Sequence, residues 1–236
     1  MLKNGYKQEF IDSIYEQIKG FGSYGFPESH AASFAILAYN SARLKVHFPA
    51  AFCCALLNRQ PMGFYSASQL IQDAVKNGVN VLPLDINERL WNCALVCDEV
   101  KVRKRTRKKT WLRLGFCMVS GMSKSVANMM VTRRGQQPLI DMRDIVQHTG
   151  IDIKTVNALT EAHAFKSLTG DRIQAKWMAT AAHIVDLPLA PNSNDHSPAP
   201  LISLTLGQDV IADFRSTGLT LRAHPLRLLR GLLKNT

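Results

Sequence analysis

The chain has 236 residues, 46% of them hydrophobic and 20% charged, which suits one sizeable folded domain or two small ones and excludes a disordered polymer. Lysine and arginine outnumber aspartate and glutamate by 29 to 18, so a polyanion is the expected partner, with nucleic acid the first candidate and an acidic membrane surface the second. The chain has no apolar run of transmembrane length, and its start, MLKNGYKQEF, lacks the apolar centre of a signal peptide, so a cytoplasmic protein is expected.

The beginning of the chain predicts a series of helices. Apolar side chains spaced three and four apart predict an amphipathic helix over residues 5–19, which we expect to end at Gly20. The next helix, residues 27–47, is apolar on nearly every face, which is typical of a buried central helix. Shorter helices are expected over residues 49–57 and 69–76, the second with a serine N-cap, either Ser66 or Ser68.

The loop before the second helix, GFGSYGFPESHAASF, is rich in glycine and aromatic residues. Pro27 fits the first helical turn, so Ser29 and His30 stand where free backbone N–H groups and the helix dipole favour an anion such as phosphate. A hydroxyl, an imidazole and an aromatic face are therefore expected to converge at one helix start. The alternative is that the aromatic residues belong to a core and that His30 is a capping histidine.

Three short strands are predicted next, at residues 79–82, 91–96 and 111–117. Between the last two lies KVRKRTRKK, residues 101–109, in which seven of nine residues are lysine or arginine. Such a run is either a solvated, mobile loop or the tip of a hairpin that lies on a phosphate backbone. In the second case it supplies salt-dependent affinity without reading bases.

Residues 118–127, MVSGMSKSVA, have the pattern of a helix-hairpin-helix module. Gly121 marks the hairpin, and Ser123 stands where a second glycine is usual and can cap the following helix, whose N–H groups would meet a DNA phosphate. Further phosphate contacts are expected from Lys124, Arg133 and Arg134. A looser unit follows over residues 150–168, with Asp152 or Thr155 as its cap; it lacks Gly-x-Gly, and we expect it to pack against the first.

The remaining segments carry weaker signals. Residues 190–200, APNSNDHSPAP, predict a polar, proline-rich linker, and residues 210–233 predict helix ending in a basic amphipathic segment. No CxxC pair is present to build a zinc site, so buried reduced thiols are expected for Cys53, Cys54, Cys93, Cys97 and Cys117.

The run from Gly20 to Asn87 closely resembles the late fingers region of bacterial C-family DNA polymerases, the family of the DNA polymerase III alpha subunit. YGFPESHAASFA followed by LLNRQPMGFY is similar to the error-prone, damage-induced branch rather than the replicative one, and a weaker resemblance extends to STGLTLRAHPLRLLR. The resemblance implies a mainly α fold with a small β element, of α+β class. The implied parts are late fingers helices over 1–90, a β element with a basic hairpin over 91–117, tandem helix-hairpin-helix units over 118–187, and a linker with a basic helical tail over 188–236.

The same resemblance implies that Tyr24, Ser29 and His30 lie in the pocket around the incoming nucleotide and the primer end. Tyr24 would stack on or check the shape of the base pair, Ser29 would form a hydrogen bond, and His30 would contact sugar, phosphate or minor groove. Lys45 is expected to serve the DNA backbone. Duplex contacts are expected from Lys101, Arg103, Lys104, Arg105, Arg107, Lys108, Lys109, Gly121, Ser123, Lys124, Arg133 and Arg134.

Nucleotidyl transfer needs paired carboxylates that hold two metal ions, and in the family these come from a palm segment with closely spaced aspartates. This sequence has no Asp-x-Asp, and Asp141 and Asp144 fit a solvated helix face. We therefore expect no catalytic residue, no metal and no other cofactor in this chain, with Mg²⁺ bound by the palm of the full polymerase.

The implied function is nucleotide, primer-template and duplex contact within an error-prone DNA polymerase of damage-induced translesion synthesis and repair. The sliding clamp and other translesion proteins are further implied partners; the nearest clamp-binding stretch, residues 184–189, lacks the glutamine and final aromatic residue of such peptides. The alternative is a stand-alone DNA-binding accessory module without chemistry.

Overall fold

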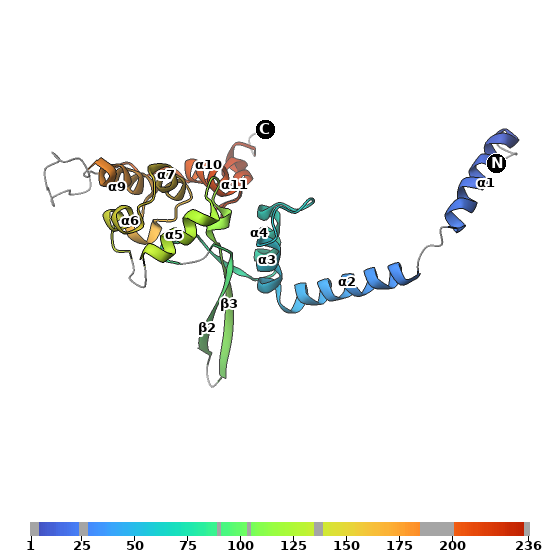
Figure 1. Ribbon diagram of the computed structural model, residues 1–236, viewed down its shortest axis with the longest axis horizontal. Helices are drawn as coiled ribbons and strands as arrows, with labels where there is room; N and C mark the ends of the chain where they lie inside the picture. The colour runs from blue at the N-terminus through green and yellow to red at the C-terminus, as the bar shows by residue number, and fades with distance from the viewer. Residues whose placement is uncertain are drawn as a thin grey trace. The chain divides into compact units, whose positions relative to one another are not determined.

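The computed structural model describes residues 5–23, 28–88, 91–102, 105–134, 139–184 and 201–233 (Figure 1). Within these ranges, the side chains of 21–23, 28–29, 98–102, 105–109, 134, 147, 183–184 and 231–233 are not described. The described residues form mainly helices and one three-stranded sheet, which confirms the predicted α+β class. The chain divides into two compact units, Met1–Phe48 and Pro49–Thr236. The predicted domain boundaries at residues 90, 117 and 187 stay predictions.

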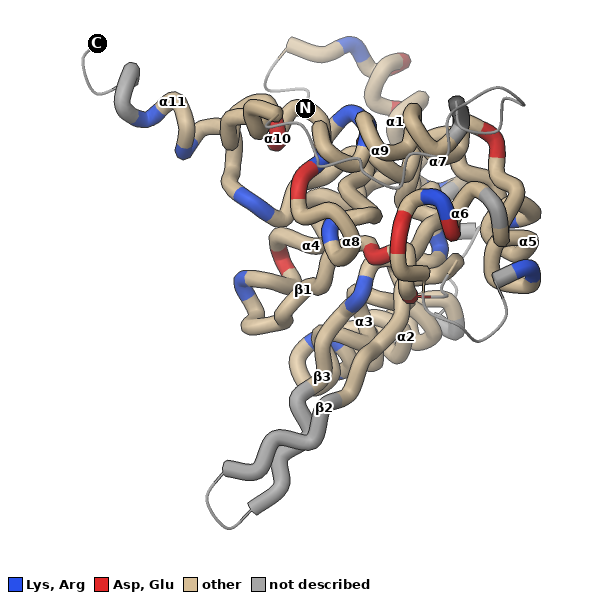
Figure 2. The backbone as a smooth tube through the Cα atoms, turned by 90° about the vertical axis from the view of Figure 1, so that its left-hand side faces the viewer, with Lys and Arg blue, Asp and Glu red and all other residues tan. Residues whose placement is uncertain are grey.

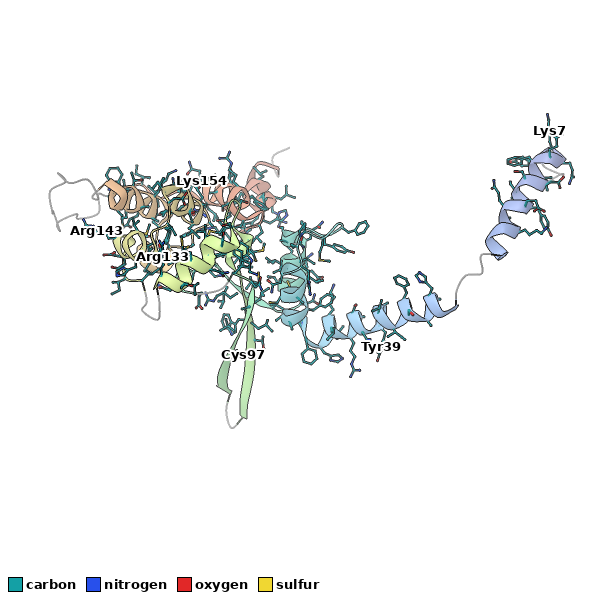
Figure 3. The ribbon with its side chains drawn as sticks, viewed as in Figure 1. Lys7, Tyr39, Cys97, Arg133, Arg143 and Lys154 are labelled. Carbon is teal, nitrogen blue, oxygen red and sulfur yellow. The ribbon has the colours of Figure 1, made fainter. Side chains whose placement is uncertain are left out.

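The first unit contains helices α1, Gln8–Ser23, and α2, Glu28–His47. Helix α1 continues past Gly20, where we predicted its end, because one glycine costs a helix only about 1 kcal/mol. Every residue of α2 from His30 onward is exposed, including Tyr39 at 65%, whose ring projects from the helix (Figure 3). The prediction of a buried central helix is therefore wrong for this unit, since its other described helix does not cover the apolar side chains of α2.

The second unit begins with helices α3, Pro49–Leu57, and α4, Ala67–Lys76. Ser66 caps α4: its Oγ accepts a hydrogen bond from the Gln69 N–H at 3.3 Å, and the Gln69 side chain accepts one from the Ser66 N–H at 3.0 Å. This reciprocal capping box satisfies backbone donors that the helix itself leaves free. It selects Ser66 over Ser68 as the predicted cap.

The sheet has the strand order β1-β3-β2 and consists of β1, Asn80–Leu82, β2, Ala94–Val102, and β3, Arg105–Arg113. Strand β1 is parallel to β3, and β2 is antiparallel to it, so β2 and β3 form a hairpin that extends away from the helices of this unit (Figure 1). Both strands continue into the basic run. Its described residues therefore belong to a hairpin rather than to a loop.

Helices complete the second unit around a continuous core to which Leu57, Leu112, Ile145, Leu159 and Phe165 contribute fully buried side chains. In chain order these helices are the 3-10 turn η2, Phe116–Met118, then α5, Lys124–Arg134, α6, Met142–Thr149, α7, Ile153–Glu161, α8, Lys166–Thr169, α9, Arg172–Ile184, α10, Leu206–Thr217, and α11, Pro225–Leu233. None of the helices within the described ranges has the length and apolar character that a membrane span requires.

Candidate nucleic-acid interface

The first predicted hairpin lies between η2 and α5. Gly121 has a φ of +80°, which turns the chain sharply, and the Ser123 Oγ accepts a hydrogen bond from the Val126 N–H at 3.3 Å. Ser123, Lys124 and Ser125 are all exposed. The first turn of α5 therefore presents backbone N–H groups, a hydroxyl and an ammonium group to the surroundings, a combination that suits a phosphate.

A second hairpin joins α6 to α7 with the same spacing. Gly150 ends α6 with a φ of +58°, Ile151 is buried, and the Asp152 Oδ1 accepts a hydrogen bond from the Thr155 N–H at 3.2 Å. In both hairpins a glycine with positive φ stands two residues before the N-cap. The sequence reasoning missed this parallel, although the spacing of Gly150 and Asp152 repeats that of Gly121 and Ser123.

The caps of the two hairpins differ in charge. Hydrogen bonds from the Thr155 side chain and backbone hold the pKa of the Asp152 carboxyl below its usual value, so the second hairpin begins α7 with a carboxylate. A carboxylate at a helix start occupies the donors and opposes a phosphate, whereas the Ser123 hydroxyl of the first hairpin is neutral. The first hairpin is therefore the better phosphate site.

Arg133 connects the two hairpins. Its Nη1 donates a hydrogen bond to the Thr149 carbonyl at 3.0 Å, joining α5 to the last turn of α6, and it lies so close to Gly150 that a Cβ there would clash with it. Figure 3 shows Arg133 on α5 and Lys154 on α7. The side chain of Arg134, the neighbouring predicted phosphate contact, lies outside the described side chains.

The basic run occupies the far end of the β2–β3 hairpin. Its register places Asp98 opposite Lys109 and Glu99 opposite Lys108. Residues 100–107, beyond these two pairs, include five basic residues and no acidic one. Figure 2 marks the charged positions of the described side chains elsewhere in the chain. Of the predicted contacts, Arg103 and Lys104 lie outside the described residues, and the backbone is described for Lys101, Arg105, Arg107, Lys108 and Lys109.

The predicted nucleotide contacts belong to the first unit. Tyr24 lies outside the described residues, and Ser29 is in the first turn of α2 without a described side chain. His30 is exposed, and its ring contacts Phe34 edge to face with the centroids 4.5 Å apart. Lys45 stands in the last turn of α2, about 22 Å along the axis from His30 at 1.5 Å per residue. The helix therefore does not bring Lys45 and His30 together.

A network of salt bridges, which the sequence reasoning did not predict, joins α10 and Arg222 to the start of α9. Arg172 at the start of α9 is 4% exposed and contacts Asp209 and Asp213 of α10, each with an N–O distance of 2.5 Å. Arg222 binds the same two carboxylates, through Nη1 to Asp209 at 2.9 Å and through Nε to Asp213 at 3.2 Å. Each carboxylate is therefore shared by two guanidinium groups.

His163 completes this network from the turn before α8. Its Nδ1 accepts a hydrogen bond from Arg222 Nη2, because a guanidinium can only donate. Burial, followed by the charges of Arg172 and Arg222, lowers the pKa of the His163 imidazole. The ring is therefore neutral at neutral pH, with its proton on Nε2.

Comparison with known protein families finds a similarity in the region of the two hairpins. A family model described as a helix-hairpin-helix motif matches residues 78–175, from the sheet to the start of α9. Within the described ranges, no cluster of three or more histidine, cysteine, aspartate or glutamate side chains is placed to hold a metal ion.

Three relatives illustrate the similarity along the whole chain. An error-prone DNA polymerase of Xanthomonas campestris pv. campestris (strain B100) is 46% identical over 236 residues, one of Methylococcus capsulatus is 44% identical over 242, and one of Pseudomonas fluorescens is 42% identical over 234. Each alignment covers 98% of this chain but only 22% or 23% of the relative. The chain thus spans less than a quarter of the length of these relatives, and the predicted resemblance to error-prone DNA polymerases is confirmed.

Proposed function

Because the chain is homologous over 98% of its length to one region of error-prone DNA polymerases, we propose that it is the part of such an enzyme that binds the primer-template duplex. The observation that carries this proposal is the exposed start of α5, where Ser123 caps the helix directly after the sharp turn at Gly121. It lies inside the region that the helix-hairpin-helix model matches. A DNA phosphate accepts hydrogen bonds from the free N–H groups there, and Lys124 adds a positive charge.

The β2–β3 hairpin supplies a second set of DNA contacts, in addition to those at the start of α5. With five basic residues beyond its two acid-base pairs, its end attracts the phosphate backbone of either strand. This attraction depends on charge rather than on base sequence, as a polymerase that moves along its template requires. Arg133 contributes indirectly, since it holds the first hairpin against the end of α6.

In the complete enzyme, the first unit contacts the incoming nucleotide and the primer end through Tyr24, Ser29 and His30, and Lys45 contacts the phosphate backbone of the DNA. The palm carboxylates, with their Mg²⁺ ions, come from another part of the polymerase. The complete enzyme acts in the cytoplasm in damage-induced translesion synthesis and cooperates with the sliding clamp and other translesion proteins. The exposed apolar side chains of α2 support this arrangement, because packing against another polymerase segment would remove them from water.

Salt-dependent binding tests the proposal. The chain is titrated against fluorescent primer-template DNA at increasing salt, alongside a variant with Gln at Lys101, Arg103, Lys104, Arg105, Arg107, Lys108 and Lys109. The variant should bind more weakly and lose about 0.9 from the slope of log affinity against log salt for each lost phosphate contact.

A matched control has Gln at seven exposed basic residues elsewhere, namely Lys7, Lys19, Arg59, Lys76, Lys166, Arg215 and Arg227. It has the same net charge as the hairpin variant and should keep most of the slope. Equal slopes in both variants would contradict the hairpin contact, and an unaltered chain that does not bind primer-template at low salt would contradict DNA binding itself.

Mixing separates a polymerase part from a stand-alone DNA-binding module. A fragment that carries the palm of a homologous error-prone polymerase is assayed for primer extension with and without this chain. Restored synthesis supports the polymerase assignment, whereas DNA binding without restoration favours the accessory module.

A further inference from the structure

Two segments cross in direct contact where the β2–β3 hairpin meets the helices. The backbone N–H of Cys117 donates a hydrogen bond to the Trp91 carbonyl at 2.9 Å. Gly115 lies so tightly against the backbone of Trp91 and Asn92 that a Cβ there would overlap it. Cys93 lies one residue before β2, and at this crossing its side chain forms a hydrogen bond with that of Cys117 in η2.

Cys93 is held rigidly at this crossing. The Asn58 side chain accepts a hydrogen bond from the Cys93 N–H at 2.7 Å and donates one to its carbonyl at 2.8 Å. The Cys54 thiol also donates to that carbonyl, at 3.2 Å. Cys93 is 3% exposed, whereas Cys117 is only partly buried.

The two thiols are not equivalent. A hydrogen bond from the Cys93 side chain lowers the pKa of the Cys117 thiol to about 7 against the opposing effect of burial, and the same contact, together with burial, raises the pKa of Cys93. Cys117 is therefore the thiolate of the pair and Cys93 the thiol that supports it. The neighbouring thiols are less reactive, since burial raises the pKa of Cys54 and that of Cys53, the latter to about 11.

We propose that Cys93 and Cys117 are an oxidation site, a thiol pair that a peroxide converts into an intramolecular disulfide across the base of the β2–β3 hairpin. The Cys117 thiolate attacks one peroxide oxygen, the O–O bond breaks, and Cys117 becomes a sulfenic acid while hydroxide leaves. The Cys93 sulfur then attacks the Cys117 sulfur, the S–O bond breaks, and the proton of Cys93 leaves with the oxygen as water. Two thiols and one hydrogen peroxide thus give one disulfide and two waters.

The disulfide would join the start of β2 to the turn after β3 and so constrain the crossing from which the basic hairpin extends. In the proposed function this hairpin contacts DNA, but the thiol chemistry does not depend on that role. The test therefore reads the bond itself rather than DNA binding.

Mass spectrometry identifies the bond. The reduced 236-residue chain is treated with hydrogen peroxide, blocked with iodoacetamide and digested with trypsin without reduction. Trypsin cuts after Arg89 and Lys101, so Cys93 and Cys97 share a peptide, and the Cys97→Ser variant removes this ambiguity. We expect residues 90–101 linked to residues 114–124 in this variant, with loss of two hydrogens and full reversal by dithiothreitol.

Substitutions of the pair give the matched comparison. Cys93→Ser and Cys117→Ser should each abolish the link, and Cys93→Ser should leave Cys117 as a sulfenic acid that dimedone traps. Circular dichroism verifies that each variant is folded, and Cys117→Ala replaces Cys117→Ser if the latter is not. A folded Cys97→Ser variant that forms no 93–117 link, or links Cys54 to Cys117 instead, overturns the proposal.

Discussion

The Nη1 atom of Arg172 lies 2.5 Å from the Oδ1 atom of Asp209, although 37 residues separate them in the chain. The second nitrogen of the same guanidinium binds Asp213, so α9 and α10 are joined by two contacts from one largely buried arginine to two carboxylates. When one partner of such buried charges is removed, the charges that remain are left uncompensated, which is strongly destabilising. The network therefore makes the folding of α10 depend on Arg172.

Arg172→Ala should destabilise the chain by about 3–5 kcal/mol, because it leaves two largely buried carboxylates with one guanidinium. The free energy of unfolding from urea titration measures the loss. Arg215→Ala is the matched control, since Arg215 is an exposed arginine of α10, and it should change stability by less than about 0.5 kcal/mol. Similar losses in both variants would show that the network does not anchor α10.

His163 should make stability depend on pH. Burial and the charges of Arg172 and Arg222 lower its pKa in the folded chain, so below the ordinary value of 6.5 the unfolded chain binds the proton more strongly. Stability should rise with pH through this window and be lost as pH falls below about 6.5. His163→Asn removes the titration and suits the positive φ of 57°.

Urea unfolding of both proteins between pH 5 and 8 measures the difference in slope, which one proton limits to about 1.4 kcal/mol per pH unit. A variant whose stability falls as steeply as that of the unaltered chain would exclude His163 as the source.

Gly150→Ala should cost more than Gly121→Ala. Both glycines have positive φ, which costs an alanine about 1–2 kcal/mol, but only at Gly150 does the new methyl group meet Arg133. Displacing Arg133 removes its hydrogen bond to the Thr149 carbonyl, adding about 1 kcal/mol. Thermal or urea unfolding measures both losses.

A double-mutant cycle isolates the contact. In an Arg133→Ala background, the cost of Gly150→Ala should fall toward that of Gly121→Ala, because the clash partner is gone. An unchanged cost would mean that backbone strain alone explains the effect.

Lys124→Ala should weaken primer-template binding more than Lys154→Ala does. Both lysines are exposed in the first turn of a hairpin's second helix, but Lys154 follows the Asp152 carboxylate, whereas Lys124 follows the Ser123 hydroxyl. Fluorescence anisotropy should show a severalfold loss of affinity and a salt slope reduced by about 0.9 for Lys124→Ala alone. Equal effects would mean that both hairpins contact phosphate.

Local signals predicted much of the second unit. Ser66 and Gln69 stand three residues apart in the chain, so their capping box can be recognised from the sequence. The strand predicted over residues 111–117 overlaps β3, Arg105–Arg113, only at its end, because β3 includes part of the basic run that lies outside the predicted strand, and Phe116–Met118 form the turn η2 instead. The residues of the first hairpin were likewise found because a glycine and a capping serine are adjacent to their helix. In each case the interacting groups are close in sequence.

The sequence reasoning failed where the interacting groups are far apart in the chain. The apolar side chains of α2 indicate a surface to be covered, but periodicity does not say which segment covers it. Arg172 finds its carboxylates on the far side of the proline-rich stretch, where no spacing rule links them. Asp152 and Thr155 were both predicted as possible caps, and the structure selects Asp152, at the end of a turn equivalent to that of Gly121.

The carboxylates of Asp209 and Asp213 lie beyond residues 185–200, and Arg172 lies before them. The segment from Arg172 to Asp213 is thus closed into a loop by salt bridges between side chains rather than by a covalent bond. Cleavage of the chain within residues 185–200 should leave two fragments that co-elute at neutral pH and separate when acid or denaturant breaks these salt bridges.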